Sequence, residues 1–168
     1  HFLFDSVRGN TSMTDKFLVS NDTSVEGANG VTGTTVTVNA DGMQVVETSI
    51  NSGELYFNSR TYVMWNWKAN GSGSSNTDGS ITSTVSANTT AGFSIVSYTG
   101  SGSTSTVGHG LGVAPNVIIW KGRNYSINWA VYHSSIGEGS KVYLDLTNAS
   151  AADTTYMNNT APTSTVFS

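Results

Sequence analysis

The sequence predicts an all-β fold, an antiparallel β-sandwich or jelly roll with little helix. Short apolar or alternating segments recur between clusters of Gly, Ser, Thr and Asn, and no window keeps an apolar period of 3.6 residues. Many short strands with frequent turn signals are typical of sandwiches and jelly rolls. Only 11% of the 168 residues are charged, against about 25% in ordinary soluble proteins. Hydroxyl and amide side chains therefore carry most of the surface polarity.

Ten strands are expected from brief apolar runs or alternation. The first four rest on Phe/Leu runs and on Thr/Val alternation, the fifth on alternating aromatic residues, and the later five on Ile, Val, Trp and Tyr. They span residues 1–7, 16–20, 34–39, 43–48, 60–68, 80–86, 92–98, 115–121, 128–133 and 141–146. A single helical turn is expected near Asn148–Ala152.

The fifth strand shows how alternation orients side chains. Val63, Trp65 and Trp67 fall on one face of residues 61–68, and the polar positions Asn66 and Lys68 fall on the other. Successive residues of a strand point to opposite faces. We therefore expect the first set to belong to the core.

An internal similarity suggests how the chain is divided. Residues 4–9 followed by 16–25 match residues 132–137 followed by 141–151: an aromatic residue, a Ser and a Gly, then a Lys-led apolar strand and an Asn-rich turn. Either this is a long repeat or two similar β-hairpins match by chance. A repeat would mean that the chain, which starts with His1, begins inside one unit and ends inside the next.

On that reading residues 1–69 are the C-terminal part of one β-sandwich unit. Residues 70–80 are a Gly/Ser-rich linker or long loop, and residues 81–168 are a second unit that continues further. A strand resembling 62–67 is then expected after residue 168.

Composition excludes several classes of protein. The net charge is −4 with seven scattered basic residues, whereas nucleic-acid binding requires clustered Lys and Arg. There is no cysteine, so disulfide frameworks and Cys-based metal sites are ruled out. The longest apolar runs are strand-sized, far below the roughly 18 residues of a membrane span. We expect neither nucleic-acid binding nor membrane insertion.

Five stretches of the chain, at 4–9, 61–69, 71–100, 107–123 and 128–133, carry a family resemblance. They resemble a module of structural proteins in tailed, often marine, bacteriophages, commonly labelled tail or tail-fibre-like with a concanavalin-like lectin sandwich. The stretch GHGLGVAP before a strand is the distinctive part. The resemblance implies a virion component exposed on the particle, and it supplies no catalytic or binding residues.

Enzymatic motifs are not found. A glycoside hydrolase needs two carboxylates about 5–9.5 Å apart across a cleft, but Glu26, Glu47, Glu54 and Glu138 are isolated in the sequence. A G-x-S-x-G elbow is also missing. We expect no enzymatic activity and no catalytic residues.

The glycine-rich segment around His109 has two interpretations. His109 faces a ligand, or the segment is a structural turn in which glycines adopt positive φ and Pro115 stiffens the entry to the next strand. The second interpretation is favoured, and the turn residues are Gly108, His109, Gly110, Gly112 and Pro115.

No cofactor or metal is expected. Calcium is the one alternative, because Asx-rich loops supply oxygen ligands. The candidates Asp78 and Asp41 do not match the D-x-[DN]-x-[DN]-G pattern, and ordinary turns explain both.

Exposed aromatic residues can pack on sugar rings. Tyr125 and Asn124 lie in a polar loop, and Trp120 and Trp129 are further candidates for glycan contacts, although core packing explains each tryptophan taken singly.

Three functions follow from these observations. The first is a virion structural module, in a tail fibre or a surface decoration, whose partners are copies of itself and other virion proteins. The second is a glycan-binding adhesin that contacts host surface polysaccharide. The weakest is a glycoside hydrolase of lectin-like fold. The first two place the protein on the virion surface.

Overall fold

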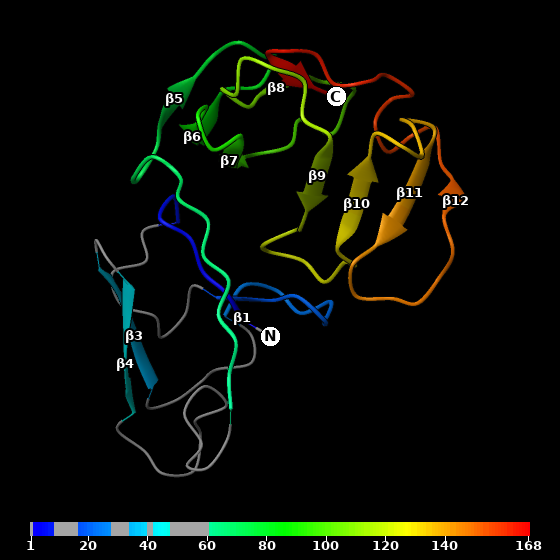
Figure 1. Cartoon of the computed structure of the whole chain (residues 1–168). Coiled ribbons are helices and arrows are strands. Elements are labelled where there is room, and N and C mark those ends of the chain that lie inside the picture. Colours follow the sequence, from blue (N-terminus) through cyan, green and yellow to red (C-terminus); the bar gives the residue numbers. More distant parts are fainter. Residues whose placement is uncertain (1, 9–16, 28–33, 40–41, 48–60) are drawn as a thin grey trace.

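The computed structural model describes residues 2–8, 17–27, 34–39, 42–47 and 61–168. This part of the chain contains only strands, turns and irregular segments (Figure 1). Its strands are β1 (Phe2–Leu3), β2 (Leu18–Val19), β3 (Thr34–Asn39), β4 (Gly42–Glu47), β5 (Ser74–Asn76), β6 (Ser83–Asn88), β7 (Phe93–Tyr98), β8 (Val107–Gly108), β9 (Val117–Trp120), β10 (Ala130–His133), β11 (Ser140–Tyr143), β12 (Ala151–Ala152) and β13 (Val166–Phe167). None of the described residues forms a helix that could span a membrane.

The strands form two larger sheets and three two-stranded pairs. One sheet has the order β5-β6-β7 and the other has the order β12-β11-β10-β9. The pairs are β1-β2, β3-β4 and β8-β13. Within the described ranges every strand pair is antiparallel, and the one parallel contact there is an isolated bridge between Ile81 and Val107.

The core lies where the two larger sheets meet the β8-β13 pair. Its buried centre is Val107, Tyr132, Met157 and Phe167, and Met157 is completely buried. Half-buried residues from both sheets pack against this centre, among them Val96 from β7 and Ile118 and Trp120 from β9. The arrangement confirms the predicted antiparallel sandwich class, because two sheets contribute inward faces to one core. A jelly-roll strand order stays a prediction.

The N-terminal segment builds a smaller apolar cluster of its own. The rings of Phe2 and Phe4 both lie near the ring of Phe17, at 5.2 and 6.5 Å between centroids. Phe17 is 2% exposed and Leu18 beside it is also buried. These contacts hold the β1-β2 pair together, because the backbone hydrogen bonds between two strands of two residues each give little stability alone.

Most predicted strands are confirmed. The predicted strand 34–39 coincides with β3, and the segments 92–98, 115–121 and 128–133 contain β7, β9 and β10. The segments 43–48, 80–86 and 141–146 overlap β4, β6 and β11, whose bounds differ by one to three residues at either end. The first two predicted strands shrink to two residues each in the structure. After β1 the chain turns, because the Asp5 carboxylate accepts the backbone N–H of Arg8.

Three predictions need correction. The helical turn expected at Asn148–Ala152 is wrong, because Ala151 and Ala152 pair with β11 and form β12. The segment 70–80, predicted as linker or loop, contains β5, which pairs with β6. The strand expected at 60–68 is wrong for residues 61–68, which form no ladder and are all exposed. The division of the chain into two units stays a prediction.

Candidate functional site

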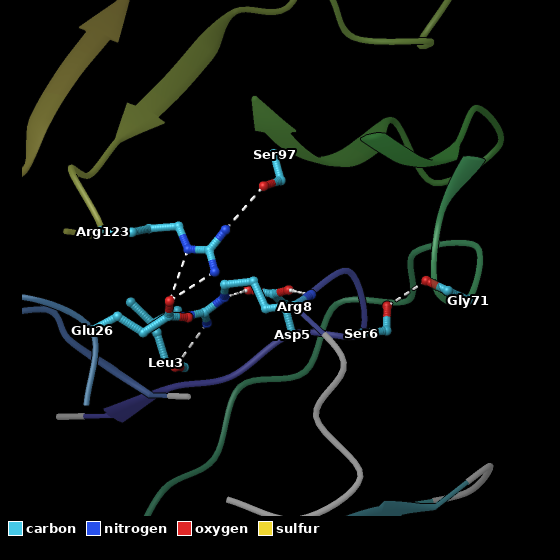
Figure 2. A network of polar contacts seen from close by, with 8 residues as sticks. All are labelled: Leu3, Asp5, Ser6, Arg8, Glu26, Gly71, Ser97 and Arg123. Carbon is cyan, nitrogen blue, oxygen red and sulfur yellow. Dashed lines mark hydrogen bonds and ion pairs between the residues drawn. The ribbon is translucent and has the colours of Figure 1, made fainter. Parts of the chain in front are cut away.

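A buried arginine organises a network of polar contacts near the N-terminus (Figure 2). The side chain of Arg8 is 4% exposed. Its guanidinium forms ion pairs with Asp5 and Glu26, the latter with 2.9 Å between Nη1 and Oε1. It also donates to the carbonyl of Leu3. A charge this deeply buried is costly unless it is paired and hydrogen-bonded, and Arg8 meets both conditions.

Glu26 joins this network to the C-terminal half of the chain. Its Oε2 accepts bonds from Nε and Nη2 of Arg123, at 2.9 and 2.7 Å. Arg123 also donates to the hydroxyl of Ser97 on β7, as Figure 2 shows. Two guanidiniums and two carboxylates thus form a neutral cluster that spans 97 residues of sequence between Glu26 and Arg123.

Backbone contacts reinforce the same junction. The N–H of Glu26 donates to the carbonyl of Arg123, and the N–H of Ile127 donates to the carbonyl of Thr23. The ammonium of Lys121 donates to the carbonyls of Thr23 and Ile127. The segment 17–27 is therefore tied to the loop between β9 and β10 by main-chain and side-chain bonds together.

Trp129 completes this junction. The residue is 5% exposed, and its indole N–H donates to the carbonyls of Val19 and Asp22, at 2.8 and 3.2 Å. A ring this deeply buried offers no face to a sugar. The interpretation of Trp129 as a glycan contact is therefore wrong, and the core interpretation holds.

Trp120 is also part of the core. Its ring packs edge-on against Tyr156 and Phe167, with centroids 5.1 and 5.6 Å apart. The side chain is half-buried and faces inward from β9. Trp120 is therefore corrected from a glycan-contact candidate to a packing residue.

Tyr125 and Asn124 lie where the sequence placed them, on the exposed loop after β9. Tyr125 is 56% exposed, and its ring lies against Gly122, where an added Cβ would come within 2.7 Å of the ring. Tyr98 at the end of β7 is 40% exposed. Burial of its inner part and the nearby Tyr125 raise the pKa of Tyr98. The Tyr98 ring packs edge-on against Phe167, with centroids 6.1 Å apart, so Tyr125 is the more exposed of the two rings.

His109 is a buried structural residue. It is 3% exposed, its Nδ1 accepts the N–H of Leu111 at 3.2 Å, and its Nε2 lies 3.2 Å from the carbonyl of Thr163. Because Nδ1 accepts and a carbonyl cannot donate, the proton sits on Nε2 of a neutral ring. Burial lowers the pKa of His109, which keeps the ring neutral.

The glycines around His109 have separate roles. Gly110 and Gly112 have φ of +69° and +76°, the left-handed region that glycine adopts without strain. Gly108 lies in β8, where a Cβ would meet the side chain of Asn76 at 1.7 Å. Pro115 is half-buried two residues before β9. The geometry agrees with a structural turn.

Residues 61–68 form an exposed extended segment, which we call the aromatic arm. Val63 is 80% exposed, Trp65 75% and Trp67 57%, and Tyr62 and Met64 are half exposed. The prediction that Val63, Trp65 and Trp67 are core residues is therefore wrong. Its end is anchored, because the Trp67 ring stacks on Phe93 with centroids 6.0 Å apart.

The comparisons with known proteins give a family and no function. The model of a domain of unknown function, DUF7483, matches residues 1–168. The chain belongs to this family. No curated protein and no solved structure matches it. The function of this DUF7483 domain is therefore inferred from its own geometry.

Two carboxylates of the DUF7483 domain that the sequence offered as site candidates form contacts within the fold. Glu26 lies in the arginine network, and Asp78 forms a closed turn with Asn76, accepting its amide at 2.8 Å and donating its own N–H to the Asn76 oxygen. Asp41, the other calcium candidate, lies outside the described residues. Among those described, no group of three or more His, Cys, Asp or Glu is placed to hold a metal ion.

Sequence reasoning missed the two most conspicuous features of this DUF7483 domain. The arginine network depends on partners 18 and 97 residues apart, which no local pattern indicates. The arm was found as a segment, but its alternation was interpreted as burial.

Proposed function

We propose that this domain is a structural module of a virion surface, in a tail fibre or decoration, that assembles with copies of itself through the aromatic arm. The observation that carries the proposal is the exposure of the arm, where two tryptophans and a valine are each more than half exposed. Contiguous apolar patches of this kind mark interaction surfaces in soluble proteins. The virion context rests on the resemblance of five stretches of the chain to tailed-phage structural modules.

The composition of the arm supports an assembly role. Tryptophan and tyrosine are enriched among residues that dominate interface energies, and the arm holds Tyr62, Trp65 and Trp67 with a single charge, Lys68. Its anchor is firm, since the Asn88 amide donates to the carbonyl of Lys68 at 3.1 Å. An anchored extended segment loses less conformational entropy on binding than a free one.

Sedimentation velocity of the purified chain over a range of concentrations tests this proposal. We expect reversible or stable oligomers, and Trp65→Ser should weaken association at least tenfold, as loss of a central aromatic anchor does. Tyr125→Ser is the matched control, because it removes an aromatic residue outside the arm that is also more than half exposed. A monomer at all concentrations, or equal effects of the two substitutions, would refute self-association through the arm. Detection of the chain by mass spectrometry in purified phage particles tests the virion context.

Glycan binding is the second candidate, and the exposed Tyr125 favours it. Tyr125 is 56% exposed and follows the exposed amide of Asn124 in the loop after β9, and sugars require this mixture of apolar face and hydrogen-bonding groups. Binding to an array of bacterial surface polysaccharides tests it. Tyr125→Ala should abolish any signal while Trp65→Ser leaves it unchanged, and a signal insensitive to Tyr125→Ala would exclude this surface.

A further inference from the structure

We propose that the aromatic arm of one chain lies along the edge strand β9 of a second copy, over the apolar outer face of the sheet β9-β10-β11. The inference rests on the proposed self-association and names the surface that receives the arm. Both halves of the contact belong to the same chain, so no further partner is needed.

The arm has the form of a strand without a sheet. Residues 61–68 are extended and exposed and make no ladder with any described strand. Beyond the stacking of Trp67 on Phe93, the N–H of Asn70 donates to the hydroxyl of Ser86 at 2.7 Å. In Figure 1 the arm precedes β5 in the chain and lies apart from the sheet β9–β12. Its C-terminal end is anchored by these contacts, and its residues are exposed along its length.

The receiving sheet has an apolar face turned away from the core. Ile118 and Trp120 of β9 face the core, so Val117 and Ile119 point to the other side. Ile119 pairs with Val131 of β10, and Val131 pairs with Val142 of β11. Paired residues share a face. Val117 is 48% exposed and Ile119 is 51% exposed, whereas Val131 and Val142 are half-buried, so the exposed apolar side chains of this face are those of β9.

The edge of this sheet is open on the side of β9. The strand order β12-β11-β10-β9 gives β9 one neighbour among the described strands. An edge strand presents backbone donors and acceptors that an extended segment can pair with. Alternate side chains of the added segment then rest on the sheet face, which suits the spacing of Val63, Trp65 and Trp67.

The area and charge of the two surfaces identify the occupant as a second copy. The arm exposes on the order of 600 Å² of apolar surface, from the typical areas of such side chains, which equals the largest patch of an ordinary monomer. A stable interface takes about 800 Å² from each partner. The arm and the β9 face together reach that area in each chain. The face is uncharged and the arm carries one charge, Lys68, so copies meet without repulsion.

Disulfide trapping between two different chains tests the contact, because the protein has no cysteine of its own. Chains carrying only Val63→Cys are mixed with isotopically labelled chains carrying only Ile119→Cys and oxidised gently. We expect an arm-to-face heterodimer as the main product, identified by the masses of the linked peptides. Ser75→Cys, at an exposed position on β5, replaces Ile119→Cys as the control and should give at least tenfold less heterodimer.

Each outcome separates this inference from the proposed function. Oligomers in sedimentation without arm-to-face links would overturn the inference and leave self-association standing. An intrachain disulfide in a chain that carries both Val63→Cys and Ile119→Cys, with no interchain product, would show that the arm folds onto its own sheet and would overturn the inference. A monomer that forms no links would overturn both. Equal yields with Ile119→Cys and Ser75→Cys would mean random collision and would also overturn the inference.

Discussion

Neutralising Glu26 should destabilise the fold far more than removing the outer arginine that it binds. The change Glu26→Gln keeps the shape of the side chain and deletes its charge, which leaves the 4% exposed guanidinium of Arg8 with Asp5 as its one remaining ionic partner among the described residues. Arg123→Ala is the matched control, since Arg123 binds the same carboxylate but its side chain is 44% exposed.

The expected magnitude follows from this geometry. Two unit charges about 4 Å apart attract by about 4 kcal/mol at an effective dielectric constant of about 20, and removing one partner of a buried pair costs about 3–5 kcal/mol. Because Arg8 keeps Asp5, we expect a loss of about 2 kcal/mol in the free energy of unfolding, or about 4–8 °C in Tm for a chain of this size. Arg123→Ala should cost less than about 1 kcal/mol, as exposed pairs do.

Urea unfolding followed by tryptophan fluorescence and circular dichroism measures both losses. Trp129 reports directly on this region, because its indole N–H binds the carbonyls of Val19 and Asp22. If Glu26→Gln and Arg123→Ala lower stability equally, within about 0.5 kcal/mol, the buried arginine does not depend on Glu26 and the reasoning fails.

Three further predictions concern other parts of the fold. Burial lowers the pKa of His109. The free energy of unfolding should therefore be constant above about pH 6.5 and fall below it, because the unfolded chain takes up the proton first. Urea midpoints measured against pH should show this fall in the parent chain and not in His109→Gln. Lys141 holds the pKa of Asp153 well below its ordinary value. This ion pair therefore stabilises the fold above about pH 3.9, and its contribution is lost on acidification. Asp153→Asn should make Tm less dependent on pH between about pH 2 and 4 in thermal melting. A Cβ on Gly79 would lie 2.3 Å from a backbone oxygen, so Gly79→Ala should cost about 2–3 kcal/mol by denaturant unfolding, whereas Gly100→Ala, with open space around it, should be neutral.

The sequence predicted strand segments well wherever local pattern and tertiary context agree. Alternating Thr and Val located β3, and the run Val117–Trp120 located β9, because both sequences suit a pleated surface on their own. The same rule misplaced the arm, because alternation indicates a strand geometry and does not say that a partner covers the apolar side. β8 and β13 were missed since each has two residues and exists only through pairing with the other.

The candidate site was less predictable for a related reason. The turn around His109 follows from glycine and proline positions alone, and the structure agrees with it. The burial of Trp129 depends on segment 17–27 lying more than a hundred residues away in sequence, and single tryptophans carry no local signal of that contact. Exposure of Tyr125 was predictable from the polar residues on either side of it.

The long-range ties of segment 17–27 also constrain the order of events during synthesis. The carbonyls of Val19 and Asp22 accept the indole N–H of Trp129, which leaves the ribosome 110 and 107 residues later. At about 5–20 residues per second, that delay is several seconds or more. The cluster of Phe2, Phe4 and Phe17 is local in sequence, whereas closure of this segment onto Trp129 must wait and has the high contact order of slow-folding β proteins.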